Sequence, residues 1–436
     1  MTGRRVVITG LGVICPLGNS KEALWDALVA GRSGVGPWDT PMTQALPASY
    51  AGLARGFTGD IENFGPLEKE QKKSIRKGLK VMCRESQMGV AAAQLAIADA
   101  ALTVGRFDPD RAGCVFGTDY MLTLPEDFSE AINACRDADG AFDYSRWGID
   151  GMVKVQPLWL LKYLPNMPAS HVAIYNDLRG PSNSITHREA AANLAVGEAF
   201  HTIARGKADI MVVGATGTRV HPMKCVHAMQ SEELANGTVE AARASRPFDR
   251  NRTGMVLGEG AGVVVLEELA IAQARGSRIY AEVVGAGSAQ VAYGNDVARR
   301  DKALGHVIRK SLAQAGIAPQ DVGHIHAHGL STQSCDIEEA RAIREEFGDA
   351  ASRIPVTAVK SYFGNLGAGS GAVELIASVL ALVNRRLPPI LNYEMPDPNC
   401  PITAATAERA DPGSSFVNLN VTPQGQASAV VVRQLA

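Results

Sequence analysis

The chain has 436 residues, enough for two domains or for one large duplicated domain. Apolar residues make up 46% of it and charged residues 20%, which is typical of packed globular proteins and excludes a disordered chain. A net charge of −2 gives no electrostatic basis for binding nucleic acid or an anionic membrane surface, so we expect small molecules and other proteins as partners.

The cysteines and the hydropathy pattern bear on the cellular compartment, on metal binding and on membrane insertion. The 7 cysteines form no C-x-x-C pair and no Cys/His cluster with zinc spacing, which predicts reduced thiols in a cytoplasmic protein without a metal or cofactor. The apolar run near the N-terminus is short and contains Gly10 and Gly12, so we interpret it as a buried strand rather than a signal peptide. No uninterrupted apolar stretch reaches about 18 residues, and no membrane span is expected.

Short apolar strands alternate with amphipathic helices along the first part of the chain. Strands are predicted at Arg5–Thr9, Gly113–Gly117, Asp209–Val213 and Gly262–Leu266. Helices are predicted near Glu85–Ala101 and Ala190–Arg205. Continuous apolar strands in such an alternation favour an α/β fold whose sheet is covered on both faces. Two long insertions, near 38–75 and 118–170, are expected to form lids, binding surfaces or interfaces.

The second part of the chain repeats the same order of elements. Strands are predicted at Tyr280–Val284, His324–His328, Pro355–Val359, Ser415–Asn420 and Ala427–Val432. Helices are predicted near Leu304–Ala315, Ile337–Phe347 and Gly371–Val383. The shared order suggests a duplication, although the two halves show little residue-level similarity.

Five segments, taken in chain order, carry a resemblance to a known family. They are "VVITGLGVICPLGNSKEALWDALVAGRSGV", "SRPFDRNRTGMVLGEGAGVVVLEE", "HAHGLSTQSCDIEEARAI", "VKSYFGNLGAGSGAVE" and "LPPILNYEMPD". Together they resemble the elongating β-ketoacyl-ACP synthases over nearly the whole chain. The resemblance implies a thiolase-like fold, with duplicated βαβαβαββ halves at 1–268 and 269–436 in five αβαβα layers. It also implies a dimer formed across the first half.

The resemblance further implies what the site should contain. In this family a cysteine thiolate at a helix N-terminus takes an acyl chain from a carrier-protein thioester, and two histidines assist decarboxylation and stabilise the oxyanion. Matched from "RGPS", the cysteine position falls on Glu189. The first histidine falls on His328 and the lysine on Lys360, whereas Asn365 stands at the second histidine. Asparagine can donate a hydrogen bond to an oxyanion but is neither an acid nor a base near neutral pH.

The substrate-binding positions depart from the family pattern as well. Leu330 stands where a threonine usually helps to hold the phosphopantetheine arm, whereas Thr332 is kept. The family's glycine-rich gating loop should fall at 418–425, "NLNVTPQG", which begins with Asn418 and Asn420 and lacks the glycine-rich character. The resemblance therefore implies a ketosynthase that does not perform the ordinary condensation.

Each candidate also has a purely structural interpretation. Thr186 and Glu189 fit a capping box, in which the two side chains satisfy free backbone N–H groups at the start of a helix. His324, His326 and His328 alternate along a strand and share one face, which is typical of a packed set at a strand end and only weakly suggests a metal. Glu374 is expected to be a structural hydrogen-bond or ion partner, and Lys360 a buried, paired lysine.

Three functional hypotheses remain open. The first is a condensation-inactive subunit, similar to chain-length factors, that acts with acyl carrier protein and an active ketosynthase in fatty-acid or polyketide synthesis. The second is an enzyme that decarboxylates, dehydrates or hydrolyses acyl thioesters with Glu189 and His328 as its acid and base. The third is a homodimer that binds acyl carriers without turnover. Whether the chain is an acyltransferase at all, and whether its dimer is homo- or heteromeric, is left open by the residues.

Overall fold

The computed structural model describes residues 3–39, 44, 46, 47, 49–294, 297–408 and 410–435. Its described strands form a mixed ten-stranded sheet in the order β12-β11-β13-β14-β8-β1-β7-β6-β4-β5. The first five strands of this order come from the second half of the chain and the last five from the first half. A short antiparallel register, in which Val6 faces Val283 and Ile8 faces Ala281, joins the two halves.

The first half supplies five of these strands and the helices that pack on them. Its strands in the large sheet are β1 (Val6–Ile14), β4 (Ala112–Thr118), β5 (Ser182–Thr186), β6 (Ile210–Thr218) and β7 (Glu259–Glu268). Its helices are α1 (Lys21–Val29), α2 (Lys69–Gly78), α3 (Arg84–Asp99), α4 (Ser129–Ala134), α5 (Met167–Asn176), α6 (Ala191–Ala204), α7 (Pro222–Ser231) and α8 (Leu269–Ala274). β2 (Val35–Pro37) and β3 (Tyr50–Gly52) pair as a separate small ribbon.

The second half repeats the arrangement. Its strands in the large sheet are β8 (Ala281–Gln290), β11 (His324–His326), β12 (Val356–Thr357), β13 (Ser415–Val421) and β14 (Gln426–Arg433). Its helices are α9 (Arg300–Ala315), α10 (Gln333–Phe347), α11 (Lys360–Phe363) and α12 (Gly369–Asn384). β9 (Ala292–Tyr293) and β10 (Val297–Ala298) form a small hairpin beside β8. Every predicted strand and helix of the large sheet and its covering layers is confirmed, with shifted ends.

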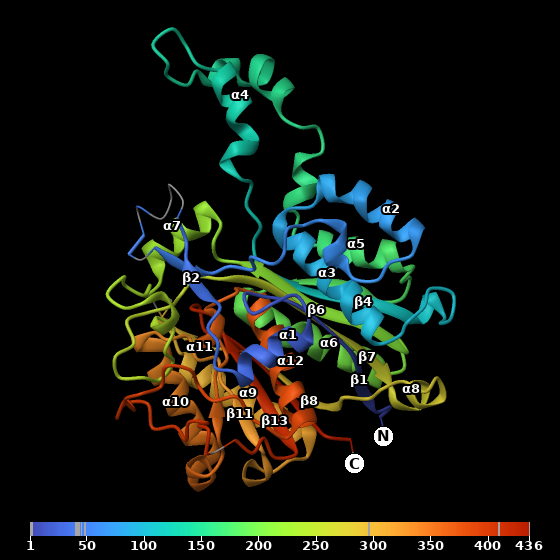
Figure 1. Ribbon diagram of the computed structural model, residues 1–436, viewed down its shortest axis with the longest axis vertical. Helices are drawn as coiled ribbons and strands as arrows, with labels where there is room; N and C mark the ends of the chain where they lie inside the picture. Colours follow the sequence, from blue (N-terminus) through green and yellow to red (C-terminus); the bar gives the residue numbers. More distant parts are fainter. Residues whose placement is uncertain are drawn as a thin grey trace.

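The topology shows the duplication directly. The half-sheet order β5-β4-β6-β7-β1 matches β12-β11-β13-β14-β8, and the parallel and antiparallel pairings match strand for strand. α6 follows β5 as α12 follows β12, and these two helices pack against each other and against strands of both half-sheets. α3 covers the outer face of the first half-sheet and α9 that of the second, which gives the predicted five αβαβα layers (Figure 1).

The central pair of helices is close because one of them carries a glycine at the crossing. A Cβ at Gly371 of α12 would stand 3.0 Å from the Cβ of Ala192 on α6 and 2.1 Å from Asn420 Oδ1. A side chain there would therefore push the two helices apart. This close approach brings the N-terminal ends of α6 and α12, and the turns that precede them, to one place between the halves.

The two predicted insertions behave differently. Within 38–75, positions 40–43, 45 and 48 lie outside the described residues, and α2 begins at Lys69. The segment between β4 and α5, which includes α4, projects from the body of the molecule as an arm (Figure 1). Several large apolar side chains on the arm are exposed, among them Tyr144 at 79% and Ile149 at 77%. The use of both insertions as lids or interfaces stays a prediction.

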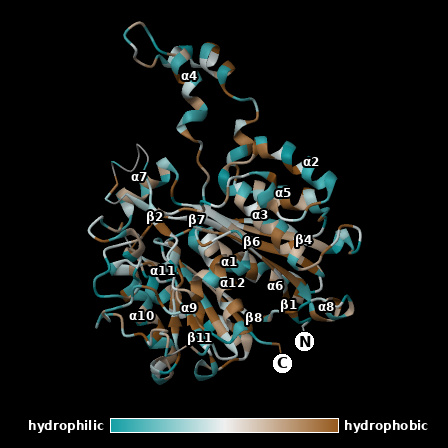
Figure 2. Cartoon of the chain, in the orientation of Figure 1, coloured by the Kyte–Doolittle hydropathy of each residue, from teal (hydrophilic) through white to brown (hydrophobic). Residues whose placement is uncertain are grey.

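Apolar residues concentrate in the strands and in the central helices, whereas the outer helices mix both kinds (Figure 2). Among the described residues, the 18-residue stretch Gly367–Asn384 is long and apolar enough to cross a membrane, but 89% of it is buried inside the fold. Its hydropathy reflects its place in the central layer, where strands pack on it from both sides.

Candidate functional site

The site begins at the sharp turn between β5 and α6. Arg188 has a left-handed backbone with φ of 48°, which is unusual for a residue with a side chain. This turn directs Glu189 inward, so that the side chain is 1% exposed at the N-terminal end of the α6 helix. Strain of this kind persists where surrounding contacts fix the backbone, and it is common at functional turns.

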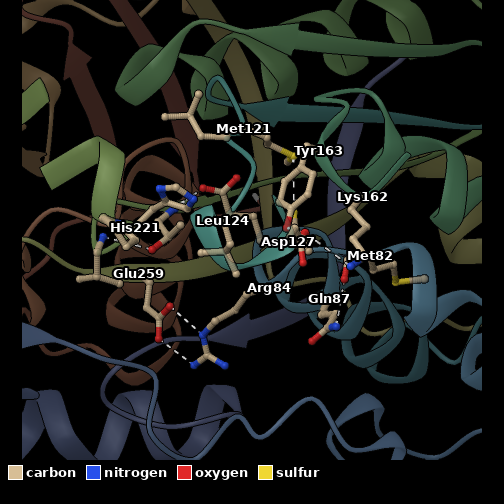
Figure 3. Close-up of a pocket in the computed structure, with 16 residues that line it drawn as sticks. Met82, Arg84, Gln87, Met121, Leu124, Asp127, Lys162, Tyr163, His221 and Glu259 are labelled. Carbon is tan, nitrogen blue, oxygen red and sulfur yellow. Dashed lines mark hydrogen bonds and ion pairs between the residues drawn. The ribbon is translucent and has the colours of Figure 1, made fainter. Parts of the chain in front are cut away.

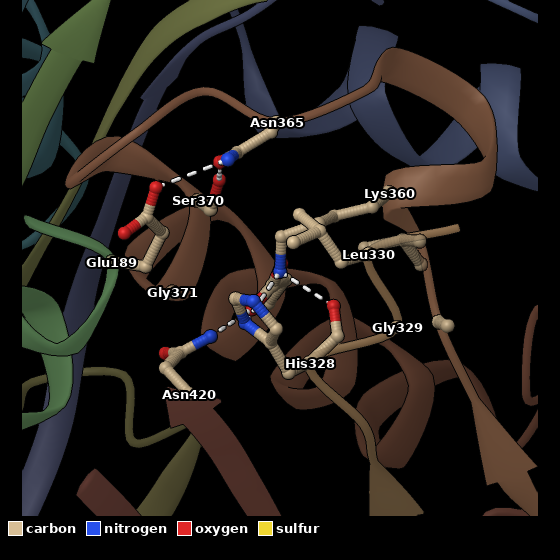
Figure 4. A network of polar contacts seen from close by, with 12 residues as sticks. Glu189, His328, Gly329, Leu330, Lys360, Asn365, Ser370, Gly371 and Asn420 are labelled. Carbon is tan, nitrogen blue, oxygen red and sulfur yellow. Dashed lines mark hydrogen bonds and ion pairs between the residues drawn. The ribbon is translucent and has the colours of Figure 1, made fainter. Parts of the chain in front are cut away.

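The predicted capping box is wrong. The Thr186 hydroxyl lies 3.2 Å from the Thr118 hydroxyl on the neighbouring strand and makes no cap to the helix. The Glu189 carboxylate does not turn back to the chain but reaches across to the second half, where Oε1 accepts a hydrogen bond of 3.1 Å from Asn365 Nδ2 (Figure 4). The left-handed Arg188 explains the difference, because it rotates Glu189 away from the free backbone N–H groups.

Two arginines hold Glu189 in its ionised form. Arg188 Nε lies 3.5 Å from Glu189 Oε2, and Arg219 Nη1 lies 4.0 Å from Oε1. Burial alone would raise the pKa of this carboxyl, but the charges of Arg188 and Arg219 and the hydrogen bond from Asn365 bring it well below the ordinary range. Glu189 is therefore a buried carboxylate anion, fixed in place by opposite charges.

Asn365 uses its hydrogen-bonding capacity within the protein. Its Oδ1 accepts from Gly367 N at 2.9 Å and from Ser370 Oγ at 3.1 Å, while its Nδ2 donates to Glu189 and contacts Met255 Sδ at 2.9 Å. The amide is thus the bridge between the β5–α6 turn and the β12–α12 turn. The oxyanion donor that the sequence predicts at this position is already engaged by the Glu189 carboxylate.

His328 lies on the other side of the site, just after β11. Lys360 Nζ donates to His328 O at 2.7 Å and contacts His328 Nδ1 at 3.3 Å, and it pairs with the Glu374 carboxylate (Figure 4). Burial and the nearby Lys360 charge lower the pKa of His328 well below its ordinary value, so the ring is neutral. With Nδ1 facing the lysine, the proton lies on Nε2, which is buried and has no hydrogen-bond partner among the described residues.

Asn418 and Asn420 occupy a strand, not a loop. Both lie in β13 and are fully buried, which corrects the prediction that a gating loop starts at 418. Asn418 Nδ2 donates to Asn193 Oδ1 at 2.9 Å, and Asn420 Nδ2 donates to Glu374 at 2.7 Å. Because Asn193 belongs to α6 and Glu374 to α12, these asparagines link the two central helices beneath the site. The chain turns only at 422–425, between β13 and β14.

Leu330 and Thr332 lie at an opening on the surface. They line a cavity of about 280 Å³ together with Glu232 and Arg300. Thr332 also caps α10, where its hydroxyl accepts from Cys335 N at 3.3 Å. Glu232 lines this opening and also accepts a hydrogen bond of 2.8 Å from Arg188. Because Arg188 is next to Glu189, Glu232 lies on the side of the opening that faces the site.

A second cavity lies at the base of the arm (Figure 3). It measures about 390 Å³, and its walls are largely apolar. Met82, Met121 and Leu124 supply much of this surface, and the Arg84–Glu259 ion pair of 2.7 Å closes one end. Cys83 also lines it, and burial raises the pKa of that thiol to about 11.

Buried charges that the sequence analysis did not single out connect these features. Arg219 and Lys224 are each 1% exposed, as is Asp119, and Glu85 is 4% exposed. Lys224 Nζ pairs with Glu85 at 2.5 Å and lies 4.0 Å from Asp119, which is itself 3.8 Å from Arg219 Nη1. Burial alone would lower the pKa of Lys224, but Glu85 and Asp119 raise it. From the sequence alone, charged residues such as these are expected to face solvent. Their burial could not be predicted, because their partners come from segments that are far apart in the chain.

The predicted histidine row is confirmed in part. His324 Nε2 and His326 Nδ1 both contact Ser378 Oγ, at 2.9 and 2.7 Å, which places them on one face of β11. Among the residues that the structure describes, neither histidine has an acidic hydrogen-bond partner, and no cluster of three or more His, Cys, Asp or Glu side chains is arranged for a metal. The pair is a packing element between β11 and α12.

Taken together, the site offers an anion, an engaged amide and a neutral imidazole. A carboxylate is a far weaker nucleophile toward a thioester than a thiolate, and here its charge is balanced by two arginines. Asn365 does not supply the second acid or base that a two-histidine site would have, which leaves the neutral imidazole of His328 without a titratable partner at that turn. The geometry suits binding a polar group better than forming a covalent intermediate.

Comparison with known proteins places these features in context. Two family models match the chain: "Beta-ketoacyl synthase, N-terminal domain" over residues 3–272 and "Beta-ketoacyl synthase, C-terminal domain" over 280–394. A 3-oxoacyl-[acyl-carrier-protein] synthase 2 of Synechocystis is 33% identical over 91% of this chain and 90% of its own length. The corresponding protein of Coxiella burnetii is 35% identical over 92% and 91%.

Solved structures give the same picture. A β-ketoacyl synthase from Burkholderia phymatum superposes with a TM-score of 0.83 at 26% identity, over 99% of this chain and 100% of that one. A type II polyketide ketosynthase in complex with its acyl-carrier protein gives 0.83 at 26% identity over 100% of both chains. The ishigamide ketosynthase/chain length factor gives 0.81 at 26% identity, also over 100% of both chains.

Proposed function

Because the chain belongs to the β-ketoacyl synthase family but carries Glu189 and Asn365 at the centre of its site, we propose that it is a condensation-inactive ketosynthase subunit. In this proposal it resembles a chain-length factor and acts with acyl carrier protein and an active ketosynthase in fatty-acid or polyketide synthesis. The observation that carries the proposal is the Glu189 carboxylate, held ionised by Arg188 and Arg219 and bonded to Asn365. A fixed anion neither accepts an acyl group readily nor releases a proton at neutral pH.

The surface of the first half supports pairing with a second chain. β5 is the edge strand of the large sheet and hydrogen-bonds to β4, while its other edge has no partner strand among the described residues. Free strand edges are places where another chain adds by backbone hydrogen bonds. The nearby arm exposes apolar side chains such as Val153 at 73% and Tyr144 at 79%, which favours contact with another protein.

A basic helix near the arm supports binding of an acidic carrier. α2 presents a series of exposed or half-exposed cations, and its last turn is basic. They are Lys69, Lys72, Lys73, Arg76 and Lys77. Clustered surface charge speeds the encounter with a partner of opposite charge, and this effect weakens as salt is added.

One observation favours the second candidate, an enzyme with altered thioester chemistry. His328 Nε2 is buried and has no hydrogen-bond partner among the described residues. When Nδ1 accepts from Lys360, the proton of the neutral ring is on Nε2 and can be donated to the carbonyl oxygen of a bound thioester. In that case Glu189 would provide charge stabilisation or act as the base. The candidate predicts that product formation depends on both residues, without any second protein.

The discriminating experiment uses the purified protein alone and together with a ketosynthase encoded in the same genome. Malonyl and acyl carrier proteins are incubated with each preparation, and their masses are measured intact. The proposal expects no product from the protein alone and a stable complex with the active ketosynthase. Product from the protein alone that disappears in Glu189→Ala would overturn the subunit hypothesis. Failure to pair, combined with tight carrier binding, would instead favour a homodimer that binds carriers without turnover.

A Glu189→Cys variant tests the placement of the nucleophile. The new thiol would lie at the N-terminal end of α6 beside Arg188 and Arg219, a setting that lowers a thiol pKa. We expect acylation of this cysteine by an acyl carrier protein without condensation, because Asn365 provides no acid or base. The same substitution at Glu198, at a half-exposed position of α6, is the control for nonspecific acylation. An inert but folded Glu189→Cys protein would contradict the assignment.

A further inference from the structure

Two cavities lie on opposite sides of the same group of buried charges. The opening of about 280 Å³ is walled by Glu232, and the cavity of about 390 Å³ beneath the arm is walled by Glu85. Glu232 pairs with both Arg188 and Arg219, and Glu85 pairs with Lys224. The charges between these two walls therefore form one connected barrier.

The barrier is continuous from one side to the other. From the opening inward it runs through Glu232, Arg219, Asp119, Lys224 and Glu85, and successive members are no more than 4.0 Å apart. Glu189 lies against it, 4.0 Å from Arg219. Lys224 also lies over the ring of Tyr120, 5.1 Å from its centre.

Leu330 and Thr332, the positions that the family resemblance assigns to the phosphopantetheine arm, lie at the opening. We therefore take the opening as the entrance for a carrier-bound acyl group, and we propose that the barrier limits the site of this chain to short acyl groups. An acyl chain that enters past Leu330 and Thr332 meets the charges near Glu189 and cannot continue to the apolar cavity beneath the arm. An acyl group that enters this protein at the opening therefore cannot reach the cavity beneath the arm. This inference rests on the proposed function and specifies its substrate class.

Physical chemistry makes the barrier difficult to pass. A hydrocarbon chain in contact with buried ions would have to displace their partners, and an ion left buried without its partner is strongly unfavourable. Moving a single side chain out of the way would break at least two contacts, because Lys224 bridges Glu85 and Asp119 and Arg219 bridges Glu232 and Asp119. Short or polar acyl groups avoid this cost, since they end before the barrier.

The test uses acyl pantetheine probes that carry a diazirine at the last carbon, one with a butanoyl and one with a decanoyl chain. After irradiation of the full-length protein, peptide mass spectrometry locates the labelled residues. In the wild-type protein we expect the butanoyl probe to label residues near Glu189 and the opening. The decanoyl probe should bind roughly tenfold more weakly or worse, and should not label Met82 or Met121 in the cavity.

The Glu85→Ala/Lys224→Ala variant removes both partners of the pair that lies next to the apolar cavity, so that neither of these two charges is left without the other. It interrupts the barrier at its inner end, while Glu232, Arg219 and Asp119 stay in place. We expect the decanoyl probe to bind this variant roughly tenfold more tightly than wild type and to label Met82 and Met121. The matched control is Lys302→Ala/Glu345→Ala, which removes an exposed Lys–Glu pair of 3.1 Å elsewhere and should leave labelling unchanged.

Wild-type labelling at Met82 or Met121 by the decanoyl probe would overturn the barrier and leave the proposed function intact. This outcome requires no variant, so it decides the question even if the alanine protein does not fold. Absence of labelling by both probes would contradict entry of acyl groups at the opening, and with it the inference; the proposed function is tested separately by the carrier-protein masses and by pairing with the ketosynthase. Failure of the folded alanine variant to admit the decanoyl probe would also contradict the inference.

Discussion

Replacing Glu189 by glutamine tests whether the carboxylate is held as a buried anion. Glutamine keeps the side-chain shape and an oxygen that accepts from Asn365 Nδ2, so the substitution removes the charge and little else. Arg188 and Arg219 would then each lose an anionic neighbour, although both keep Glu232. The expected result is a folded protein of lower stability.

The magnitude follows from the two distances. At 3.5 and 4.0 Å and an effective dielectric constant of about 20, each arginine contributes roughly 4–5 kcal/mol of attraction to Glu189. Desolvation of the buried carboxylate offsets this by several kcal/mol. We therefore expect Glu189→Gln to lower the free energy of unfolding by about 2–4 kcal/mol near neutral pH.

The pH dependence has a definite sign. The folded-state pKa of Glu189 lies below its unfolded value, so the unfolded carboxyl binds a proton first as the pH falls. The stability that Glu189 provides is then fully present above about pH 4.3 and decreases below it toward the folded-state pKa. The difference between wild type and Glu189→Gln should shrink in the same range.

Urea unfolding followed by circular dichroism, at a series of pH values from neutral to acidic, measures this difference. The control is Glu198→Gln on the same helix, whose carboxylate accepts from Asn183 at a half-exposed position and should change stability by no more than about 0.5 kcal/mol. Equal stability of Glu189→Gln and wild type at neutral pH would refute the buried-anion description. So would a difference that grows as the pH falls.

Three further outcomes test the surroundings of the site. Lys360→Met should lower the free energy of unfolding by roughly 3–5 kcal/mol by leaving the Glu374 charge without its cation, whereas the double variant with Glu374→Gln, which keeps an acceptor for Asn420, should recover most of it in urea unfolding. Cys83, half-buried and with a pKa raised to about 11, should react slowly with iodoacetamide at neutral pH; rapid alkylation of this residue, located by peptide mass spectrometry, would contradict the raised pKa. Thr118→Val and Thr186→Val should each cost about 1 kcal/mol, because they break the same contact, and a clearly larger loss at Thr186 would restore its role as a cap.

The order and type of the large elements could be predicted from the sequence because each is a strong local pattern. β6 and β7 are continuous apolar runs, and α3 and α6 are long enough for their helical spacing to stand out. β5 was not among the predicted strands, since Ser182–Thr186 is polar and lies at the edge of the sheet, where one neighbour is enough to fix it. Hydrophobic patterns identify strands through their buried side chains. β5 is mostly exposed, so it has no such pattern.

The sequence predicted the site residues that stand next to recognisable turns, but not the residues from distant segments that contact them. Glu189, His328 and Asn365 could be located because they follow recognisable turns, but their partners could not. The capping box failed for a backbone reason, the left-handed φ of Arg188, which no sequence pattern marks for an arginine. The sequence analysis did not identify Arg219 and Lys224, because a buried cation can be recognised only when the positions of its anionic partners in the fold are known.

The duplication explains why the two departures from the family pattern belong together. Glu189 follows β5 and Asn365 follows β12, so they occupy corresponding turns before α6 and α12, and the close approach of these helices at Gly371 brings the turns into contact. A carboxylate at one turn requires a donor at the other, and the Asn365 amide supplies it without introducing a second titratable group. A histidine at position 365 would be drawn into an ion pair with Glu189, and a neutral apolar residue would leave Oε1 without its hydrogen bond. The two residues are therefore best understood as one unit that replaces a reactive pair with a stable contact between the halves.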